Sequence, residues 1–180
     1  MNYANLVTNK TARLPGDLAL PPATATITGL RFAVYGKPAA AGSKRGFAFK
    51  GKDGKTHVAI SDANKNARPW KSAVTDAALQ EFTGAQFTGP VKLEIVFWIQ
   101  RPKGHYGSGK NAGVVKASAP ERPTGKPDLL KLARGVEDAI TDAGVWRDDA
   151  QVVIESLEKR WSQDGGYRTD VTITAREESC

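Results

Sequence analysis

The stretch KPDLLKLARGVEDAITDAGVWRDDAQ, residues 126–151, decides the fold of this 180-residue chain, because it contains a helix, a turn and the start of a strand. Pro127 suits the first helical position, and Gly144 suits the residue just past the helix end. Between them, apolar residues recur at the spacing of one helix face. The pattern predicts a helix that packs on a core through a stripe formed by Leu129, Leu132, Ala133, Val136, Ile140 and Ala143.

Leu130 is the only large apolar residue on the opposite, polar face of this expected helix. At about 100° per residue, that face also carries Arg134, Glu137, Asp138 and Thr141. The other positions of the helix separate clearly into apolar and polar sets. A polar residue is therefore expected at position 130, and Leu130 departs from the pattern.

Three carboxylates flank the expected helix. Asp128 stands at its start, and Asp148 and Asp149 follow its end, just before an apolar run that opens a strand. Magnesium takes oxygen ligands and usually shares one or two carboxylates with a substrate phosphate. The arrangement predicts a Mg²⁺ site formed by Asp128, Asp148 and Asp149. The alternative is that Asp148 and Asp149 form a solvated turn, since short motifs of this kind often arise without a function.

Taken together, PDLLKLARGVEDAI and AGVWRDDAQV resemble the signature of the RusA-type Holliday junction resolvases, a family found in bacteriophages and prophages. That signature is P-D-x-D-N/K-L-x-K/R-x-x-x-D-A-L followed by G-V-W-x-D-D-A-Q-V. The upstream segments GKPAAAGSKRGF and RPKGHYGSGK also resemble members of this family. The resemblance therefore extends from about Arg31 to Thr174.

The resemblance implies a homodimeric, Mg²⁺-dependent endonuclease that cuts four-way DNA junctions in recombination and repair. By position in the motif, Asp128 and Asp149 match catalytic aspartates, with Asp148 beside them. Arg134 stands where the family has an essential lysine or arginine. Leu130 stands where the family has its second catalytic aspartate. Because leucine cannot bind a cation, this departure predicts weak metal binding and reduced or absent cleavage, with DNA binding retained.

The composition favours a polyanionic partner, since the formal net charge is +7 and the isoelectric point is near 9.6. A basic domain without any acidic partner is the alternative. The cations expected to contact DNA are Lys44, Arg45, Arg101, Lys103, Lys126, Lys131 and Arg134.

Several functional classes are not supported by any motif. No apolar run reaches the length of a membrane helix, and no secretory signal pattern opens the chain. The single cysteine, Cys180, fits a reducing compartment, so we expect a cytoplasmic protein. The sequence has no P-loop and no dinucleotide-binding turn, which predicts that no nucleotide cofactor is bound.

Residues 101–125 form a long segment rich in Gly, Ser, Ala and Pro that carries several cations and runs directly into Asp128. Loops of more than about 15 residues are uncommon in compact domains and are usually functional or disordered. We expect a flexible cationic loop that follows branched DNA, with plain disorder as the alternative.

The remaining periodicities predict a single α/β (α+β) domain over residues 27–176, preceded by a flexible arm over residues 1–26. Its mixed, mainly antiparallel sheet is expected to have two helices packed on it. One helix starts at Pro69, and the Asp53–Gly54 dipeptide predicts a hairpin. Strands are expected over residues 27–35, 47–49, 57–60, 91–99, 152–161 and 167–175.

Three functional hypotheses follow. The first is a junction-directed endonuclease. The second is a catalytically inactive protein that binds branched DNA on the same scaffold. The third is a general basic nucleic-acid-binding module in which the carboxylates are structural. A comparison of junction binding with Mg²⁺-dependent nicking separates them.

Overall fold

The computed structural model describes residues 29–41, 44–62 and 64–176. The expected N-terminal arm, the start of the first expected strand at residue 27 and Cys180 lie outside these ranges. The domain boundary at residues 26–27 therefore stays a prediction.

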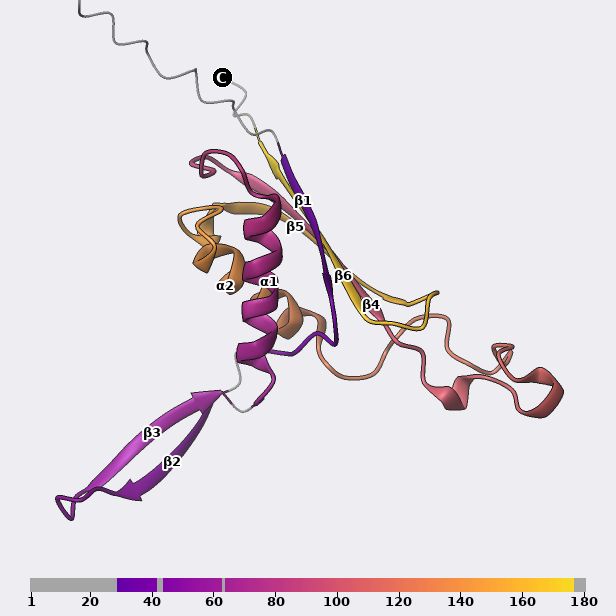
Figure 1. Cartoon of the computed structure of the whole chain (residues 1–180), viewed down its shortest axis with the longest axis horizontal. Coiled ribbons are helices and arrows are strands. Elements are labelled where there is room, and N and C mark those ends of the chain that lie inside the picture. Colours follow the sequence, from indigo (N-terminus) through magenta and orange to yellow (C-terminus); the bar gives the residue numbers. More distant parts are fainter. Residues whose placement is uncertain (1–28, 42–43, 63, 177–180) are drawn as a thin grey trace, which may run out of the picture.

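Four strands form the central sheet, in the order β1 (Gly29–Tyr35), β6 (Arg168–Ala175), β4 (Val91–Ile99) and β5 (Val152–Trp161). Strand β6 runs antiparallel to both β1 and β4, whereas β4 and β5 are parallel. The parallel pair is possible because helix α2 lies between β4 and β5 in sequence and returns the chain to the start of the sheet. The expected mixed, mainly antiparallel sheet is confirmed (Figure 1).

Both helices, α1 (Ala67–Glu81) and α2 (Leu129–Asp142), cover the same face of the sheet (Figure 1). Helix α1 packs against β1, α2 packs against β5, and the two helices pack against each other. Strand β4 turns alternate side chains into this layer, as the period-2 pattern predicts. Its fully buried residues are Val91, Leu93, Ile95 and Phe97.

Helix α1 begins at Ala67, two residues before the expected start at Pro69, and it ends at Glu81. Pro69 is compatible with this position because a residue in the first turn has no intrahelical acceptor for an N–H group. The buried face carries Trp70, Val74 and Ala78.

Helix α2 begins at Leu129, with Asp128 as its N-cap residue, so the expectation that Pro127 occupies the first helical position is wrong. The backbone at Asp128 is still extended, and the Lys126–Pro127 peptide bond is cis. The apolar stripe lies in the core as predicted, although Leu129 is only partly buried. Leu130 is 70% exposed, which confirms its place on the polar face. Gly144 follows the helix with a φ of 69°, a conformation that suits glycine.

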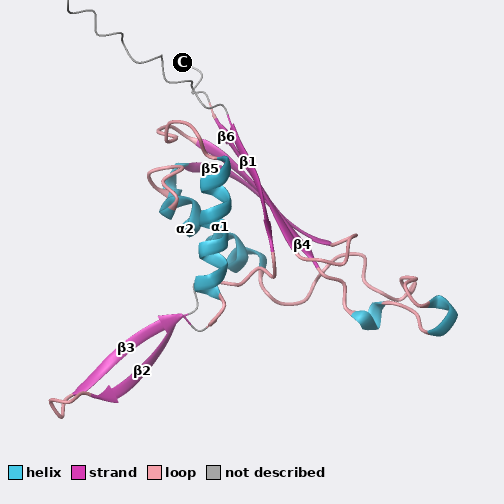
Figure 2. Cartoon of the chain, in the orientation of Figure 1, coloured by secondary structure: helices cyan, strands magenta, loops and turns pink. Residues whose placement is uncertain are grey.

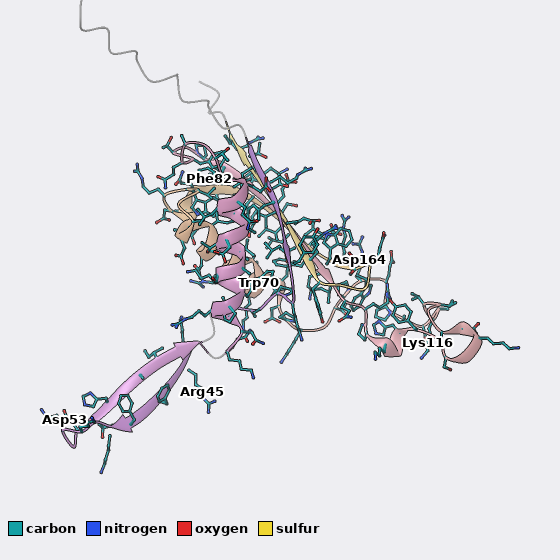
Figure 3. The ribbon with its side chains drawn as sticks, viewed as in Figure 1. Arg45, Asp53, Trp70, Phe82, Lys116 and Asp164 are labelled. Atoms are coloured by element: carbon teal, nitrogen blue, oxygen red, sulfur yellow. The ribbon has the colours of Figure 1, made fainter. Side chains whose placement is uncertain are left out.

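The expected hairpin is present, and its strands are longer than predicted. Strand β2 (Lys44–Lys50) pairs antiparallel with β3 (Thr56–Asp62) through seven residue pairs. It projects away from the helices as a separate two-stranded sheet (Figure 1). Figure 3 places Arg45 toward its base and Asp53 at its tip.

Residues 101–125 have local structure, so the expected loop without secondary structure is wrong in this respect (Figure 2). Two 3₁₀ turns, Lys103–His105 and Gly109–Asn111, lie within the segment. It is also fixed to β5, because the Trp161 indole donates to the Pro120 carbonyl at 2.9 Å. Among the described residues, no helix is long and apolar enough to cross a membrane.

Candidate active site and nucleic-acid interface

The corner between α2 and β5 is built on buried aromatic packing. Val145 and Trp146 are fully buried, and the Trp146 indole donates to the Thr141 hydroxyl at 2.7 Å. Trp146 also forms a β-bridge with Phe87, in the segment that precedes β4. This packing returns the chain from the end of α2 toward the sheet, and it fixes where the following aspartates emerge.

Two glutamine side chains hold the backbone of this corner. The Gln86 amide donates to the carbonyls of Gly144 and Trp146, at 3.0 and 3.1 Å. The Gln151 amide donates to the carbonyls of Phe87 and Gly89, both at 2.9 Å, while its oxygen accepts from the N–H groups of residues 147 and 148. Backbone groups near the surface are thus paired, and the corner is a rigid platform.

Asp148 has a structural role at this corner. Its Oδ1 accepts from the Ala150 N–H at 2.8 Å and caps the 3₁₀ turn Asp149–Gln151. Together with Gln151 it forms a capping box. Asp149, the next residue, is exposed.

Asp149 belongs to an acidic cluster that also contains Glu137 on α2 and Glu155 on β5. Burial, together with the negative charges of Glu155, Asp149 and Asp138, raises the pKa of Glu137 to about 7, and the nearby Arg134 opposes this rise. Burial also raises the pKa of Glu155. Neither Glu137 nor Glu155 was among the residues predicted to form the site. A usable signal was present, because Glu137 follows Leu130 by two helical turns on the same polar face.

Asp128 lies at the other end of α2. Its carboxylate is exposed and pairs with the Lys131 ammonium at 3.6 Å. Glu137 follows Asp128 by nine positions, which corresponds to about 13 Å along the helix axis. Within the described parts of the chain, no three His, Cys, Asp or Glu side chains form a group that could hold a metal ion. Metal ligation by Asp128, Asp148 and Asp149 therefore stays a prediction.

A cationic groove runs between the two helices and the start of the hairpin. It has a volume of about 580 Å³, and its lining includes the side chains of Lys44, Arg68, Lys71 and Arg134, with Asp138 and Asp142. The Lys71 ammonium is partly neutralised by Asp142, at 2.7 Å. We call this feature the α1/α2 groove.

Two predicted DNA-binding residues, Lys44 and Arg134, line this groove together, although they are far apart in sequence. Arg68 and Lys71, on α1, also line the groove and were not among the predicted DNA-binding cations. Their spacing of three residues, which places them on one side of a helix, was the available signal.

The other predicted DNA-binding cations are dispersed. Arg45 lies on the hairpin, and Lys131 pairs with Asp128. Arg101 donates to the Pro120 carbonyl at 3.2 Å and stacks over the Trp161 ring, so it helps to fold the 101–125 segment. Lys103 opens the first 3₁₀ turn of that segment, and Lys126 lines a separate pocket beside Pro127.

This chain is similar to known proteins over most of its length. The sequence profile of the family described as "Endodeoxyribonuclease RusA" matches residues 41–174, which include the hairpin, both helices and the corner. This chain belongs to the RusA endodeoxyribonuclease family. It is also similar to the uncharacterized protein YqaN of Bacillus subtilis strain 168, with 32% identity over 138 residues, which cover 75% of this chain and 89% of that protein.

Much of the RusA signature in this chain has a structural role. Gly144, Trp146 and Gln151 form the corner, whereas Asp128 and Asp149 present exposed carboxylates. Carboxylate oxygens are suitable donors for Mg²⁺, which needs few protein ligands when phosphate supplies others. The donor chemistry at positions 128 and 149 therefore fits this ion, and Leu130 offers it nothing.

Proposed function

We propose that this RusA-family protein is a structure-selective endonuclease that binds four-way DNA junctions and hydrolyses phosphodiester bonds with Mg²⁺. The α1/α2 groove is the observation that carries the proposal. Its four cations lie beside the polar face of α2, on which Arg134 is exposed. Contacts between cations and phosphates position DNA without reading its sequence, so branch geometry would supply the selectivity.

Arg134 is the cation we assign to the reacting phosphate, because a guanidinium can stabilise the charge that develops on phosphate oxygens. We assign Mg²⁺ binding to Asp128 and Asp149, with Asp148 both capping the turn and adding negative charge beside them. When bound, Mg²⁺ activates water and stabilises the attacking and leaving oxygens. We further propose that the active form is a homodimer, since a four-way junction offers two equivalent strands.

Leu130 limits this activity in our proposal. It is exposed on the same helix face as Arg134, one turn away, and it lacks the carboxylate that the family signature has there. The second candidate function is therefore a protein that binds branched DNA without cutting it. The exposed leucine at position 130, which supplies no carboxylate to a metal ion, favours this candidate for the wild-type chain.

The deciding experiment is a nicking assay on a synthetic four-way junction, with and without Mg²⁺, using the wild-type chain and Leu130→Asp. We expect the substitution to raise the Mg²⁺-dependent rate by on the order of 100-fold or more, because even groups outside a metal's ligand set often contribute about 10–100-fold.

Leu130→Asn is the matched control, since it is polar and of similar size to aspartate but carries no charge. It is expected to leave the rate close to that of the wild-type chain. If Leu130→Asp and Leu130→Asn nick the junction at the same rate, position 130 does not contribute a metal ligand.

A further inference from the structure

The β2–β3 hairpin exposes apolar side chains on both of its faces. Cross-strand pairs share a face, so the register places Phe47, Phe49 and His57 on one side and Val58 and Ile60 on the other. Phe47 and Phe49 are 51% and 48% exposed, and Val58 and Ile60 are each 70% exposed. We call the first side the aromatic face and the second the aliphatic face.

The exposed apolar side chains of the β2–β3 hairpin indicate that it binds a partner. Every described position of β2 is exposed, and the hairpin extends away from the rest of the molecule (Figures 1 and 3). An isolated two-stranded hairpin is at best marginally stable in water. Contiguous exposed apolar residues generally mark a binding surface.

The rings of the aromatic face are ordered against each other. The centroids of Phe47 and Phe49 are 6.3 Å apart, and Phe49 stacks on the His57 imidazole at 5.7 Å and 27°. The His57 ring is held in turn by Asp53 at the hairpin tip, with Nε2 to Oδ1 at 3.1 Å. The hairpin thus presents a line of ring faces on a strand of about 23 Å.

Charge identifies the kind of partner. Residues 44–62 contain five lysines and arginines but only two aspartates. Two copies of this hairpin would repel each other, whereas a polyanion would be attracted. Lys44 is the first residue of β2 and also lines the α1/α2 groove. A nucleic acid bound in the groove would therefore lie next to the hairpin.

We propose that the aromatic face of the β2–β3 hairpin binds unpaired or unstacked DNA bases by stacking. This inference rests on the proposed function only in taking DNA as the ligand. Bases stack on aromatic side chains with little regard to sequence, because every base has a ring face. A branch point interrupts the stacking of base pairs, so it offers such bases where continuous duplex does not. The hairpin would then contribute the preference for branched over linear DNA.

The experiment measures binding of the full chain in EDTA, so that cleavage plays no part. Fluorescence anisotropy is recorded with a single-stranded oligonucleotide, a four-way junction and a linear duplex. Phe47→Leu with Phe49→Leu removes both rings and keeps apolar bulk. We expect affinity for single strand and junction to fall by on the order of tenfold or more. Affinity for linear duplex is expected to change by less than about threefold, since phosphate contacts dominate there.

Two matched variants separate ring stacking from other effects. Phe47→Tyr with Phe49→Tyr keeps both rings and is expected to bind like the wild-type chain. Val58→Ala with Ile60→Ala removes apolar area from the aliphatic face and is expected to do the same. Equal loss in the leucine and alanine variants would mean that binding depends on the apolar area of the hairpin in general and not on its rings, and unchanged binding in the leucine variant would mean that the rings do not stack on bases. Either result overturns the inference.

Sedimentation tests the competing partner, a second copy of this chain. If the oligomeric state of the leucine variant differs from that of the wild-type chain, the aromatic face is a protein contact and the inference fails. The proposed nuclease function fails separately, when Leu130→Asp does not nick junctions although ring-dependent binding persists. A wild-type chain that binds none of the three DNAs would overturn both.

Discussion

The pKa of the Glu137 carboxyl group lies well above its ordinary value. It is half-buried on α2, and Glu155, Asp149 and Asp138 add negative charge around it, so its pKa rises from 4.5 to about 7. The folded protein therefore holds a proton on Glu137 between about pH 4.5 and 7 that the unfolded chain releases. Because the folded state binds more protons in this window, its stability falls as the pH rises.

We predict that the free energy of unfolding decreases from pH 5.5 to pH 8, and that Glu137→Gln makes this decrease smaller; Glu155, whose pKa burial also raises, contributes to what is left. Partial exposure weakens the effect, so we expect a gain of about 1 kcal/mol for the variant at pH 8 and little change at pH 5.5. Urea denaturation at the two pH values measures it.

Glu81→Gln is the control, because Glu81 ends α1 on the surface. It is expected to leave the slope of stability against pH unchanged. A Glu137→Gln variant whose stability falls between pH 5.5 and 8 as steeply as that of the wild-type chain would show that Glu137 is not the group responsible.

The elements show why sequence patterns succeeded for some segments and not for others. Strand β4 was predicted over its full length, because a half-buried strand has alternating buried and exposed positions, and these appear in the sequence as alternating apolar and polar residues. The stripe of α2 was predicted for the same reason. The start of α2 was not, because Pro127 is compatible with helix and with extended chain, and only the local backbone decides between them.

The polar face of α2 offered Glu137 as a candidate, but its proximity to Glu155 could not be predicted, because that depends on how the elements pack. Glu137 and Glu155 come from α2 and β5, and their proximity follows from the corner that turns the chain back along the helix. The α1/α2 groove depends in the same way on residues from β2, α1 and α2. Periodicity places a residue on a face of its own element, but it does not say which face of another element it meets.

Gly135 shows the same dependence within one helix. It is buried on α2 where the segment that leads to the hairpin passes, and the Ala41 N–H donates to the Lys131 carbonyl at 2.8 Å. A Cβ atom at position 135 would lie 3.4 Å from the Ala41 Cβ and 3.5 Å from the Ala39 carbonyl oxygen, both ordinary contacts.

We therefore predict that Gly135→Ala stabilises the protein by about 0.5–1 kcal/mol, because alanine is the better helix former and its methyl group fits. Gly135→Leu adds bulk that the passing segment cannot accommodate, and it is expected to cost about 1–3 kcal/mol. Urea denaturation measures both variants. If the alanine variant is destabilised as much as the leucine variant, the segment packs more tightly on α2 than these distances indicate.

At the scale of the whole molecule, two cationic projections extend from the body in different directions. The hairpin leaves one end, and the 101–125 segment leaves the other (Figure 1). That segment carries Arg101, Lys103, Lys110, Lys116 and Arg122 against the single acid Glu121. The α1/α2 groove lies at the base of the hairpin, since Lys44 belongs to both. In the proposed complex, cations on both projections and in the groove could therefore contact more than one DNA arm at once.

This arrangement makes a prediction about salt. Each phosphate that a cation neutralises releases condensed counterions, so the logarithm of the binding constant falls with the logarithm of salt concentration by about 0.9 per contact. Arg68 lines the groove and has no assigned role in catalysis. Arg68→Gln is expected to reduce this slope by about 1 and to weaken junction and duplex binding alike.

Arg31→Gln is the control, because Arg31 is exposed on β1 and contacts Thr172 rather than the groove. Titrations at several salt concentrations decide the matter: equal slopes for Arg68→Gln and Arg31→Gln would mean that DNA does not occupy the groove.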